Sequence, residues 1–199
     1  MWSSKQVCEM YTDEDLIKGC IRKEREAQKE LYDRYADILL GICARYASDT
    51  AEAEDILQEG FVRIFTYITD FSGKGSLFNW MRKIMINTAI TVYHRNLKHR
   101  YHQEIETVQE PSRDVMPGSS DFTHEELLIV LRSLPEGYRI IFNLYAVEGF
   151  RHKEIAEMLG IDVNTSKSQY SRARRFLRKK LEELSRIAVP DKKDGHGEE

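Results

Sequence analysis

The stretch from His152 to Lys180 constrains the fold most, because a short helix pattern, a glycine and a second, strongly basic helix pattern follow one another directly. Ile155, Ala156 and Leu159 share one side of the first pattern, which ends at Gly160. The turn of a helix-turn-helix needs a residue with positive φ, which glycine adopts readily, and a small residue such as Ala156 lets two helices cross closely. The stretch therefore predicts a helix-turn-helix.

The second of these two helices is unusually basic. Between Val163 and Lys180 there is no acid, and the bases are Lys167, Arg172, Arg174, Arg175, Arg178, Lys179 and Lys180. A basic helix at the end of a helix-turn-helix suits the phosphates of a DNA major groove. The alternative is an ordinary helix with a solvated basic side, but turn geometry and charge coincide in the order that DNA binding requires.

The total charge argues against nucleic-acid binding, whereas the distribution of charge favours it. The chain has a formal net charge of −3. Acids outnumber bases between Glu9 and Glu59, while the stretch from Phe71 to Gln103 contains bases and no acid. An acidic front, a basic middle and a basic C-terminal helix indicate separate surfaces for separate partners.

Cysteine usage and hydropathy predict a cytoplasmic protein. The cysteines are Cys8, Cys20 and Cys43, an odd number without C-x-x-C spacing, which favours reduced thiols over disulfides or a zinc site. No apolar run approaches the roughly 20 residues of a membrane span, and no signal peptide follows Met1, so no membrane insertion is expected. No metal or other cofactor is expected either, because His94, His99 and His102 lack metal-ligand spacing with carboxylates.

The predicted fold class is all-α, with two small helical domains joined by a flexible linker. No strand-period run appears, and the four prolines fall between or after periodic segments. The residues from Tyr101 to Asp121 are rich in acids and contain Pro111 and Pro117, which predicts an acidic flexible linker. The expected domains are 10–100 and 122–186, with the linker at 101–121 and a disordered tail at 187–199. The expected helices cover 13–21, 24–46, 51–69, 77–99, 123–134 and 138–147, followed by the helix-turn-helix pair.

The third expected helix has a polar side that could bind a partner. Its apolar stripe includes Ile56, Phe61 and Ile64, and the opposite side carries Asp55, Gln58, Glu59, Val62 and Arg63. The plain interpretation is the wet side of an amphipathic helix. Val62 in the middle of this side, surrounded by acids and an amide, favours an interaction surface for a basic partner.

The fourth expected helix is apolar on two opposite sides. Leu77, Trp80 and Met81 lie on one side, and Ile86 and Ile90 point nearly the other way. Such a helix is either buried between neighbours or lends one apolar side to a ligand. We expect Trp80 to be a core residue. The remaining surface carries Arg82, Lys83, Asn87 and His94, which is typical of groups that bind single-stranded nucleic acid.

The loop from Phe71 to Ser76 precedes this helix, and Ser76 is its expected N-cap. The loop lacks the G-x-x-x-x-G-K-[ST] spacing and a preceding strand, so nucleoside triphosphate binding is not expected. Lys74 and the backbone donors of the loop could instead hold an extruded base or a phosphate. No nucleophile-plus-base motif stands out, so the chain is not expected to be an enzyme.

Two blocks of this sequence resemble the sigma factors of bacterial RNA polymerase. AEDILQEGFVRIF (53–65) with SLFNWMRKIMINTA (76–89) is similar to their conserved region two, and residues 131–181 are similar to region four. A short chain with only these two regions and a linker resembles the extracytoplasmic-function group. The resemblance implies an alternative sigma factor that directs core RNA polymerase to promoters and helps to melt the minus-ten element.

The resemblance also implies roles for particular residues. The third helix would dock on the clamp of core polymerase, and region four would contact the flap and read the minus-thirty-five element. An anti-sigma protein is a further candidate partner. The expected core-polymerase residues are Asp55, Gln58, Glu59, Val62 and Arg63. The expected minus-ten residues are Phe71, Lys74, Ser76, Asn79, Arg82, Lys83, Asn87 and His94. The expected minus-thirty-five residues are Asn164, Thr165, Lys167, Ser168, Gln169, Ser171, Arg172, Arg174 and Arg175.

One residue departs from the family pattern. Ser166 stands in the inward stripe of the recognition helix, in line with Val163, Tyr170, Ala173 and Leu177, where relatives commonly carry an apolar residue. A buried hydroxyl needs a partner, and a carbonyl one turn back is the expected one.

The alternative function for the whole chain is a free-standing helix-turn-helix regulator with an N-terminal dimerisation or sensing domain, and a weaker alternative is an RNA-binding module.

Overall fold

The computed structural model describes residues 11–103 and 123–188, and every regular element in these ranges is helical. The predicted all-α fold is confirmed for this part of the chain. Most of the expected linker, the tail and Cys8 lie outside the described residues. The chain divides into two compact units, Met1–Cys43 with Thr50–Ala89, and Ala44–Asp49 with Ile90–Glu199. The domain boundaries expected from the sequence stay predictions.

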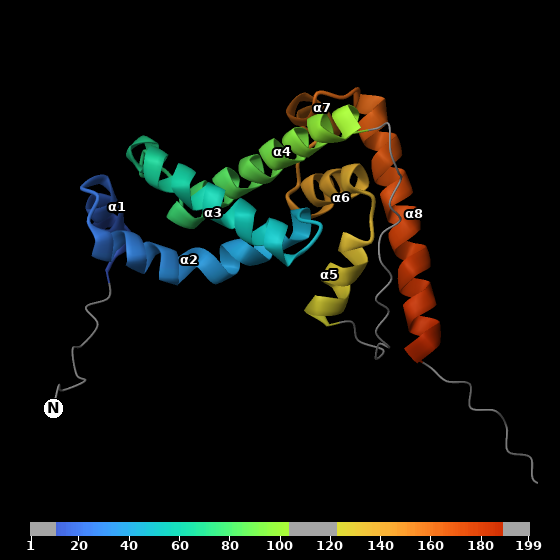
Figure 1. Ribbon diagram of the computed structural model, residues 1–199, viewed down its shortest axis with the longest axis horizontal. Helices are drawn as coiled ribbons and strands as arrows, with labels where there is room; N and C mark the ends of the chain where they lie inside the picture. Colours follow the sequence, from blue (N-terminus) through green and yellow to red (C-terminus); the bar gives the residue numbers. More distant parts are fainter. Residues whose placement is uncertain (1–10, 104–122, 189–199) are drawn as a thin grey trace, which may run out of the picture. The chain divides into compact units, whose positions relative to one another are not determined.

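The N-terminal helices have the expected order and nearly the expected bounds. They are α1 (Asp13–Ile21), α2 (Arg25–Tyr46), α3 (Thr50–Tyr67) with the 3₁₀ turn η1 (Ile68–Asp70), and α4 (Leu77–Gln103) (Figure 1). A capping box begins α1, since the Thr12 hydroxyl accepts from the Asp15 N–H and the Asp15 carboxylate accepts from the Thr12 N–H. The Asp15 carboxylate also accepts from the Thr12 hydroxyl, and this bond, followed by the one from the Thr12 N–H, holds the pKa of Asp15 below its ordinary value. The fourth helix extends beyond the predicted end at 99, because no glycine or proline follows it until Pro111.

The core of the first unit forms where α1, α2, α3 and α4 pack together. Its largest fully buried side chains are Leu16, Leu31, Leu39, Ile56, Ile64, Ile68, Leu77, Met81 and Met85. Gly60 lets α3 approach α4 closely, because a Cβ atom at this position would lie 2.1 Å from Sδ of Met85. Tyr35 packs its ring near Phe78 and donates a hydrogen bond to Asp13 Oδ1 at 2.9 Å. These contacts hold the polar side of α3 and the first half of α4 on one rigid support.

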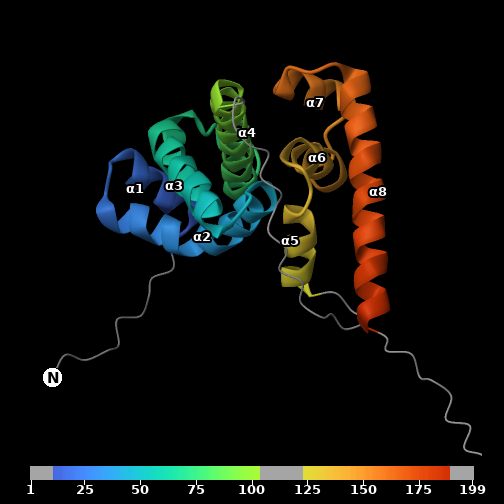
Figure 2. The ribbon, with the colours of Figure 1, turned by 45° about the vertical axis from the view of Figure 1, so that its right-hand side comes forward.

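The C-terminal helices are α5 (His124–Arg132), α6 (Glu136–Phe142), the π-helical segment η2 (Asn143–Val147), α7 (His152–Leu159) and α8 (Val163–Ala188). Thr123 forms a capping box with Glu126 at the start of α5. Pro135 separates α5 from α6 and is the N-cap of α6, so α6 begins at Glu136 and not at the predicted Tyr138. Figure 2 shows α5, α6 and α7 beside the long rod of α8.

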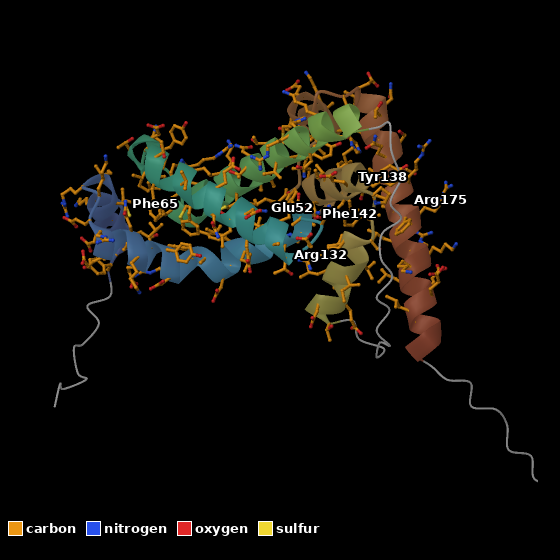
Figure 3. All side chains as sticks on the ribbon, viewed as in Figure 1. Glu52, Phe65, Arg132, Tyr138, Phe142 and Arg175 are labelled. Atoms are coloured by element: carbon orange, nitrogen blue, oxygen red, sulfur yellow. The ribbon has the colours of Figure 1, made fainter. Side chains whose placement is uncertain are left out.

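Two packed groups hold these helices to α8. The first consists of Val130, Leu134, Ala173 and Leu177, with Tyr138 and Phe142 packed against it. Figure 3 shows Tyr138 and Phe142 on α6, and Arg175 on the opposite side of α8. The second group comprises the buried apolar residues of α6, η2 and α7, which are Ile140, Ile141, Leu144, Ile155, Ala156 and Leu159. Buried Arg139 donates from Nη1 to the carbonyl oxygens of Arg132 and Leu134, which ties α6 to the end of α5.

Candidate interfaces for nucleic acid and protein

The polar side of α3 is exposed as the periodicity predicts. Asp55 and Gln58 are exposed, and Val62 has 65% of its surface accessible. Glu59 and Arg63 are half-buried and form an ion pair at 2.6 Å, one turn apart on the helix. This α3 surface therefore exposes a carboxylate, an amide and a valine beside the Glu59–Arg63 ion pair. Such a surface suits a partner with both cationic and apolar groups.

The loop from Phe71 to Ser76 is held at both ends. The Phe71 ring lies 5.6 Å from the Trp80 ring, centroid to centroid, and the Ser76 hydroxyl accepts from the Asn79 N–H at 3.4 Å. Ser76 thus caps α4 as predicted. Trp80 is only half-buried, so the expectation of a core residue is wrong in part: its ring packs against that of Phe71 at the start of the loop. Lys74 lies exposed between Gly73 and Gly75, both with positive φ.

Helix α4 uses its two apolar sides for packing. Met81, Met85, Ile86, Thr88 and Ile90 are all buried, which favours burial between neighbours over an apolar side lent to a ligand. The hydroxyl of Thr88 bonds to the carbonyl oxygen of Ile84 one turn back.

The polar candidates on α4 are therefore confined to a narrow outward stripe. Asn79, Lys83 and Asn87 are exposed at four-residue spacing, and Arg82 is half-buried beside them. His94 lies in the second unit, where Nε2 is 3.2 Å from the carbonyl oxygen of Met158. Asn79, Lys83 and Asn87 thus share one exposed side of α4, and His94, two turns further along the same helix, is half-buried.

The turn of the helix-turn-helix is stabilised locally. Gly160 has φ 65° and ψ 35°, and its N–H and that of Ile161 both point to the Ala156 carbonyl oxygen, which ends α7. Asp162 then begins α8, since its Oδ1 accepts from the Asn164 N–H at 2.7 Å. The predicted helix-turn-helix is confirmed, and its second helix starts at Val163.

One side of α8 is exposed and carries most of the predicted minus-thirty-five residues. Thr165 and Gln169 are half-buried, and Oε1 of Gln169 would lie 3.4 Å from a Cβ atom at Gly137 on α6. On the side opposite the buried Ser166, Ala173 and Leu177, exposed residues recur at intervals of three and four. We call it the α8 stripe, and it consists of Asn164, Lys167, Ser168, Ser171, Arg172 and Arg175.

The arginines extend this positive surface beyond the stripe. The Arg174 guanidinium lies 5.8 Å from the centroid of the Tyr170 ring, within the range of a cation–π contact. Tyr170, Ser171, Arg174, Arg175 and Arg178 surround a shallow hollow on this helix. A negatively charged ligand bound at the α8 stripe would therefore also lie close to the guanidinium groups beside the stripe.

The partner of Ser166 differs from the expected one. Ser166 is completely buried, and its Oγ lies 3.0 Å from Nδ1 of His152, not beside a carbonyl one turn back. His152 is in turn stacked on Tyr145 and meets the edge of Tyr170. Sequence reasoning placed Tyr170 on the inward side of α8 but did not identify His152 and Tyr145 as its neighbours, although the inward-facing serine signalled that some polar group must approach it.

Nothing in the described residues indicates a metal site or a membrane segment. No cluster of His, Cys, Asp and Glu within 11–103 and 123–188 could hold a metal ion. In the same ranges, none of the helices combines the length and the apolar character needed to cross a bilayer. Cys20 and Cys43 are buried and form no disulfide, and burial raises the pKa of Cys20 to about 11, with Glu24 adding to the effect. Burial keeps the Cys20 thiol protonated and unreactive, and both cysteines belong to the core.

Comparison with protein families matches both helical regions. The model for sigma-70 region 2 matches residues 31–99, which contain the α3 surface, the 71–76 loop and most of α4. The model for sigma-70 region 4 matches residues 124–177, which contain the helix-turn-helix and the α8 stripe. A free-standing regulator or an RNA-binding module would not explain both matches in this order.

Whole-chain relatives agree with these matches. The RNA polymerase sigma-H factor of Pseudomonas aeruginosa is 26% identical, over 88% of this chain and 97% of the relative. The ECF RNA polymerase sigma-E factor of Haemophilus influenzae is 25% identical, over 89% of this chain and all of the relative. The fold is also similar to that of the sigma factor RpoE from Bartonella quintana, solved with the anti-sigma factor NepR, with a TM-score of 0.51, 20% identity, and coverage of 77% and 96% of the two chains. With both conserved regions in order and relatives matched over nearly their whole length, the chain belongs to the sigma factors of bacterial RNA polymerase, in the extracytoplasmic-function group.

Proposed function

We propose that this alternative sigma factor divides its work among three surfaces. Sigma factors direct core RNA polymerase to promoters and are not enzymes. The α3 surface would bind core polymerase, the 71–76 loop and the α4 residues Asn79, Lys83 and Asn87 would hold the melted minus-ten strand, and the α8 stripe would read the minus-thirty-five duplex. Because its partner is core polymerase, the protein would act in the cytoplasm.

The α8 stripe is the observation that carries the proposal. It offers Asn164, Lys167 and Ser168 at the N-terminal end of the recognition helix, where base edges are read in helix-turn-helix complexes. Arg172 and Arg175 continue the same side, where they can meet phosphates. Thr165 and Gln169 have weaker support as base readers, because both are half-buried.

For the melted strand, the support is the exposed set beside the loop. Lys83 and Asn87 supply a cation and an amide, and Lys74 lies on the loop itself. Stacking or pocketing an unpaired base is worth about 1–3 kcal/mol, comparable with the few kcal/mol needed to unpair it. One captured base could therefore tip local opening once polymerase supplies the other contacts.

Charge reversal on the α3 surface tests whether the chain works as a sigma factor through this surface. Asp55→Lys changes an exposed residue and leaves the Glu59–Arg63 ion pair in place. If Asp55 meets a buried cationic partner, the reversal should weaken core binding by about 2–5 kcal/mol. Pull-down with purified core polymerase, followed by run-off transcription, measures the effect. Glu26→Lys, an equally exposed reversal on α2, is the matched control and should bind normally.

Two outcomes would contradict the proposal at different levels. Unchanged binding of Asp55→Lys would remove the assignment of the α3 surface to core polymerase. Failure of the wild-type chain to bind core polymerase would contradict the function itself. An anti-sigma partner for this chain stays a prediction, and the same pull-down from cell extract, without added core polymerase, would look for one.

A further inference from the structure

Buried Ser166 and half-buried His152 form a polar contact between the two helices of the helix-turn-helix. Ser166 near the start of α8 is fully buried, as are Ile155 on α7 and Ala173 on α8. Its Oγ lies 3.0 Å from Nδ1 of His152, the first residue of α7. Thr88 shows the usual alternative, because its buried hydroxyl bonds to a carbonyl of its own helix. The Ser166 contact instead joins two different helices.

The His152 ring is held by two tyrosines. It stacks on Tyr145 at 4.2 Å with an interplanar angle of 13°, and it meets Tyr170 at 5.8 Å and 61°. Tyr145 belongs to the π-helical segment η2, a rare backbone form that is often kept where a side chain must be placed. Tyr145 and Tyr170 also contact each other, with centroids 4.5 Å apart. The ring nitrogen that meets Ser166 therefore comes from a ring fixed by η2, α7 and α8 together.

The position of Ser166 on α8 links this contact to the exposed side of the helix. Ser166 lies between Thr165 and Lys167 and directly opposite the α8 stripe. An apolar contact has no preferred direction, whereas a hydrogen bond prefers an angle above about 150° and weakens steeply below about 120°. A bond at Ser166 therefore restrains rotation of α8 about its axis at the turn that carries Asn164 and Ser168.

We propose that His152 is a positioning residue for promoter reading: through Ser166 it sets the rotation of the recognition helix and hence the direction in which Asn164, Lys167 and Ser168 face the base pairs. The proposal rests on the proposed function of the α8 stripe. His152 touches no DNA in this scheme, and phosphate contacts by Arg172 and Arg175 tolerate small rotations because their side chains are long. The pair should thus affect sequence preference more than general affinity for DNA.

The experiment uses holoenzyme reconstituted from core polymerase and the full chain. Selection by wild-type holoenzyme from a duplex library randomised at the upstream element yields a preferred duplex, and a shuffled version of it serves as reference. The ratio of the two affinities is measured for His152→Ala, Ser166→Ala and the double variant. Ser185→Ala is the matched control, because this exposed serine on α8 donates to the Leu181 carbonyl oxygen within its own helix.

Loss of one hydrogen bond should reduce the ratio about 3- to 10-fold in each single variant, with the affinity for the shuffled duplex within about twofold of wild type. The double variant should be no worse than either single variant, because both remove the same contact. His152→Asn should restore most of the ratio, since its amide places a donor or acceptor near the position of Nδ1. Ser185→Ala should behave as wild type.

The apolar pair His152→Leu with Ser166→Val provides a second route if the alanine variants fold poorly, since it leaves no unsatisfied polar group. It should fold and still show the reduced ratio. The proposal is overturned if folded alanine or apolar-pair variants keep the wild-type ratio, if both duplexes lose affinity equally, or if His152→Asn restores nothing. A wild-type holoenzyme that selects no upstream sequence would instead overturn the proposed function of the α8 stripe.

Discussion

Helices α4 and α8 are almost equal in length, 27 and 26 residues, but they divide their surfaces in opposite ways. Buried residues occupy two sides of α4, from Met81 and Met85 round to Ile86 and Ile90. In α8 the buried residues are confined to one seam, Ser166, Ala173 and Leu177 among those described. A helix packed on two sides leaves only a narrow stripe exposed to a ligand, whereas α8, packed on one side, leaves most of its circumference exposed.

The largest expected difference between the two helices concerns stability. Met85→Ala removes a fully buried side chain that fills the space at Gly60, and it should lower the free energy of unfolding by about 2–5 kcal/mol. Phe176→Ala on α8 truncates a residue that is 39% exposed and should cost about 1 kcal/mol or less. Urea unfolding followed by circular dichroism measures both. Equal losses would contradict the contrast in packing.

The next effect tests the narrow stripe of α4. Lys83→Ala with Asn87→Ala should leave core binding and the closed complex unchanged and should reduce the open complex about tenfold, since one base contact is worth about 1–3 kcal/mol. Permanganate footprinting of promoter thymines measures the opening. Lys29→Ala, an exposed change on α2, is the control. Normal thymine reactivity in the double variant would make α4 only a scaffold.

On α8, a smaller effect should separate phosphate contacts from base reading. Arg175→Ala should weaken holoenzyme binding on every duplex and lower the slope of log affinity against log salt by about one. Asn164→Ala should leave this slope unchanged and alter which upstream sequence is preferred. Titrations at several salt concentrations on two duplexes compare them. A change of preference in Arg175→Ala without a change of slope would reverse the two assignments.

The smallest expected effect is a pH dependence from His152. Burial lowers the pKa of His152, and the charge of Lys167 lowers it further, so the folded protein favours the neutral ring. The unfolded chain, with an ordinary histidine pKa of about 6.5, then binds the proton more readily, and stability falls as pH decreases through and below that value. The urea midpoint should therefore drop less between pH 7.5 and pH 5.5 in His152→Asn than in wild type. Identical drops would show that His152 does not contribute.

Features that depend on residues close together in the chain were predictable from the sequence. The bounds of α1 and α2, the cap at Ser76 and the turn at Gly160 match the structure within one or two residues, because caps and glycine turns act over a few residues. The exposure of Asp55 and Val62 followed from the period of α3 alone. The composition of α8 likewise marked its exposed side before any packing was known.

Only the tertiary structure decided which groups face one another. Periodicity places Ser166 on the inward side of α8, but the partner, His152, comes from another helix fourteen residues earlier in the chain. The same limit applies to Trp80, which lies half-buried under Phe71, and to Gln169, which turns toward Gly137. The two apolar sides of α4 fitted either a ligand or a core, and only packing against its neighbours chose the core. Helix period fixes the direction of a side chain within its own helix, whereas its partner depends on how separate helices pack, and that is a property of the whole fold.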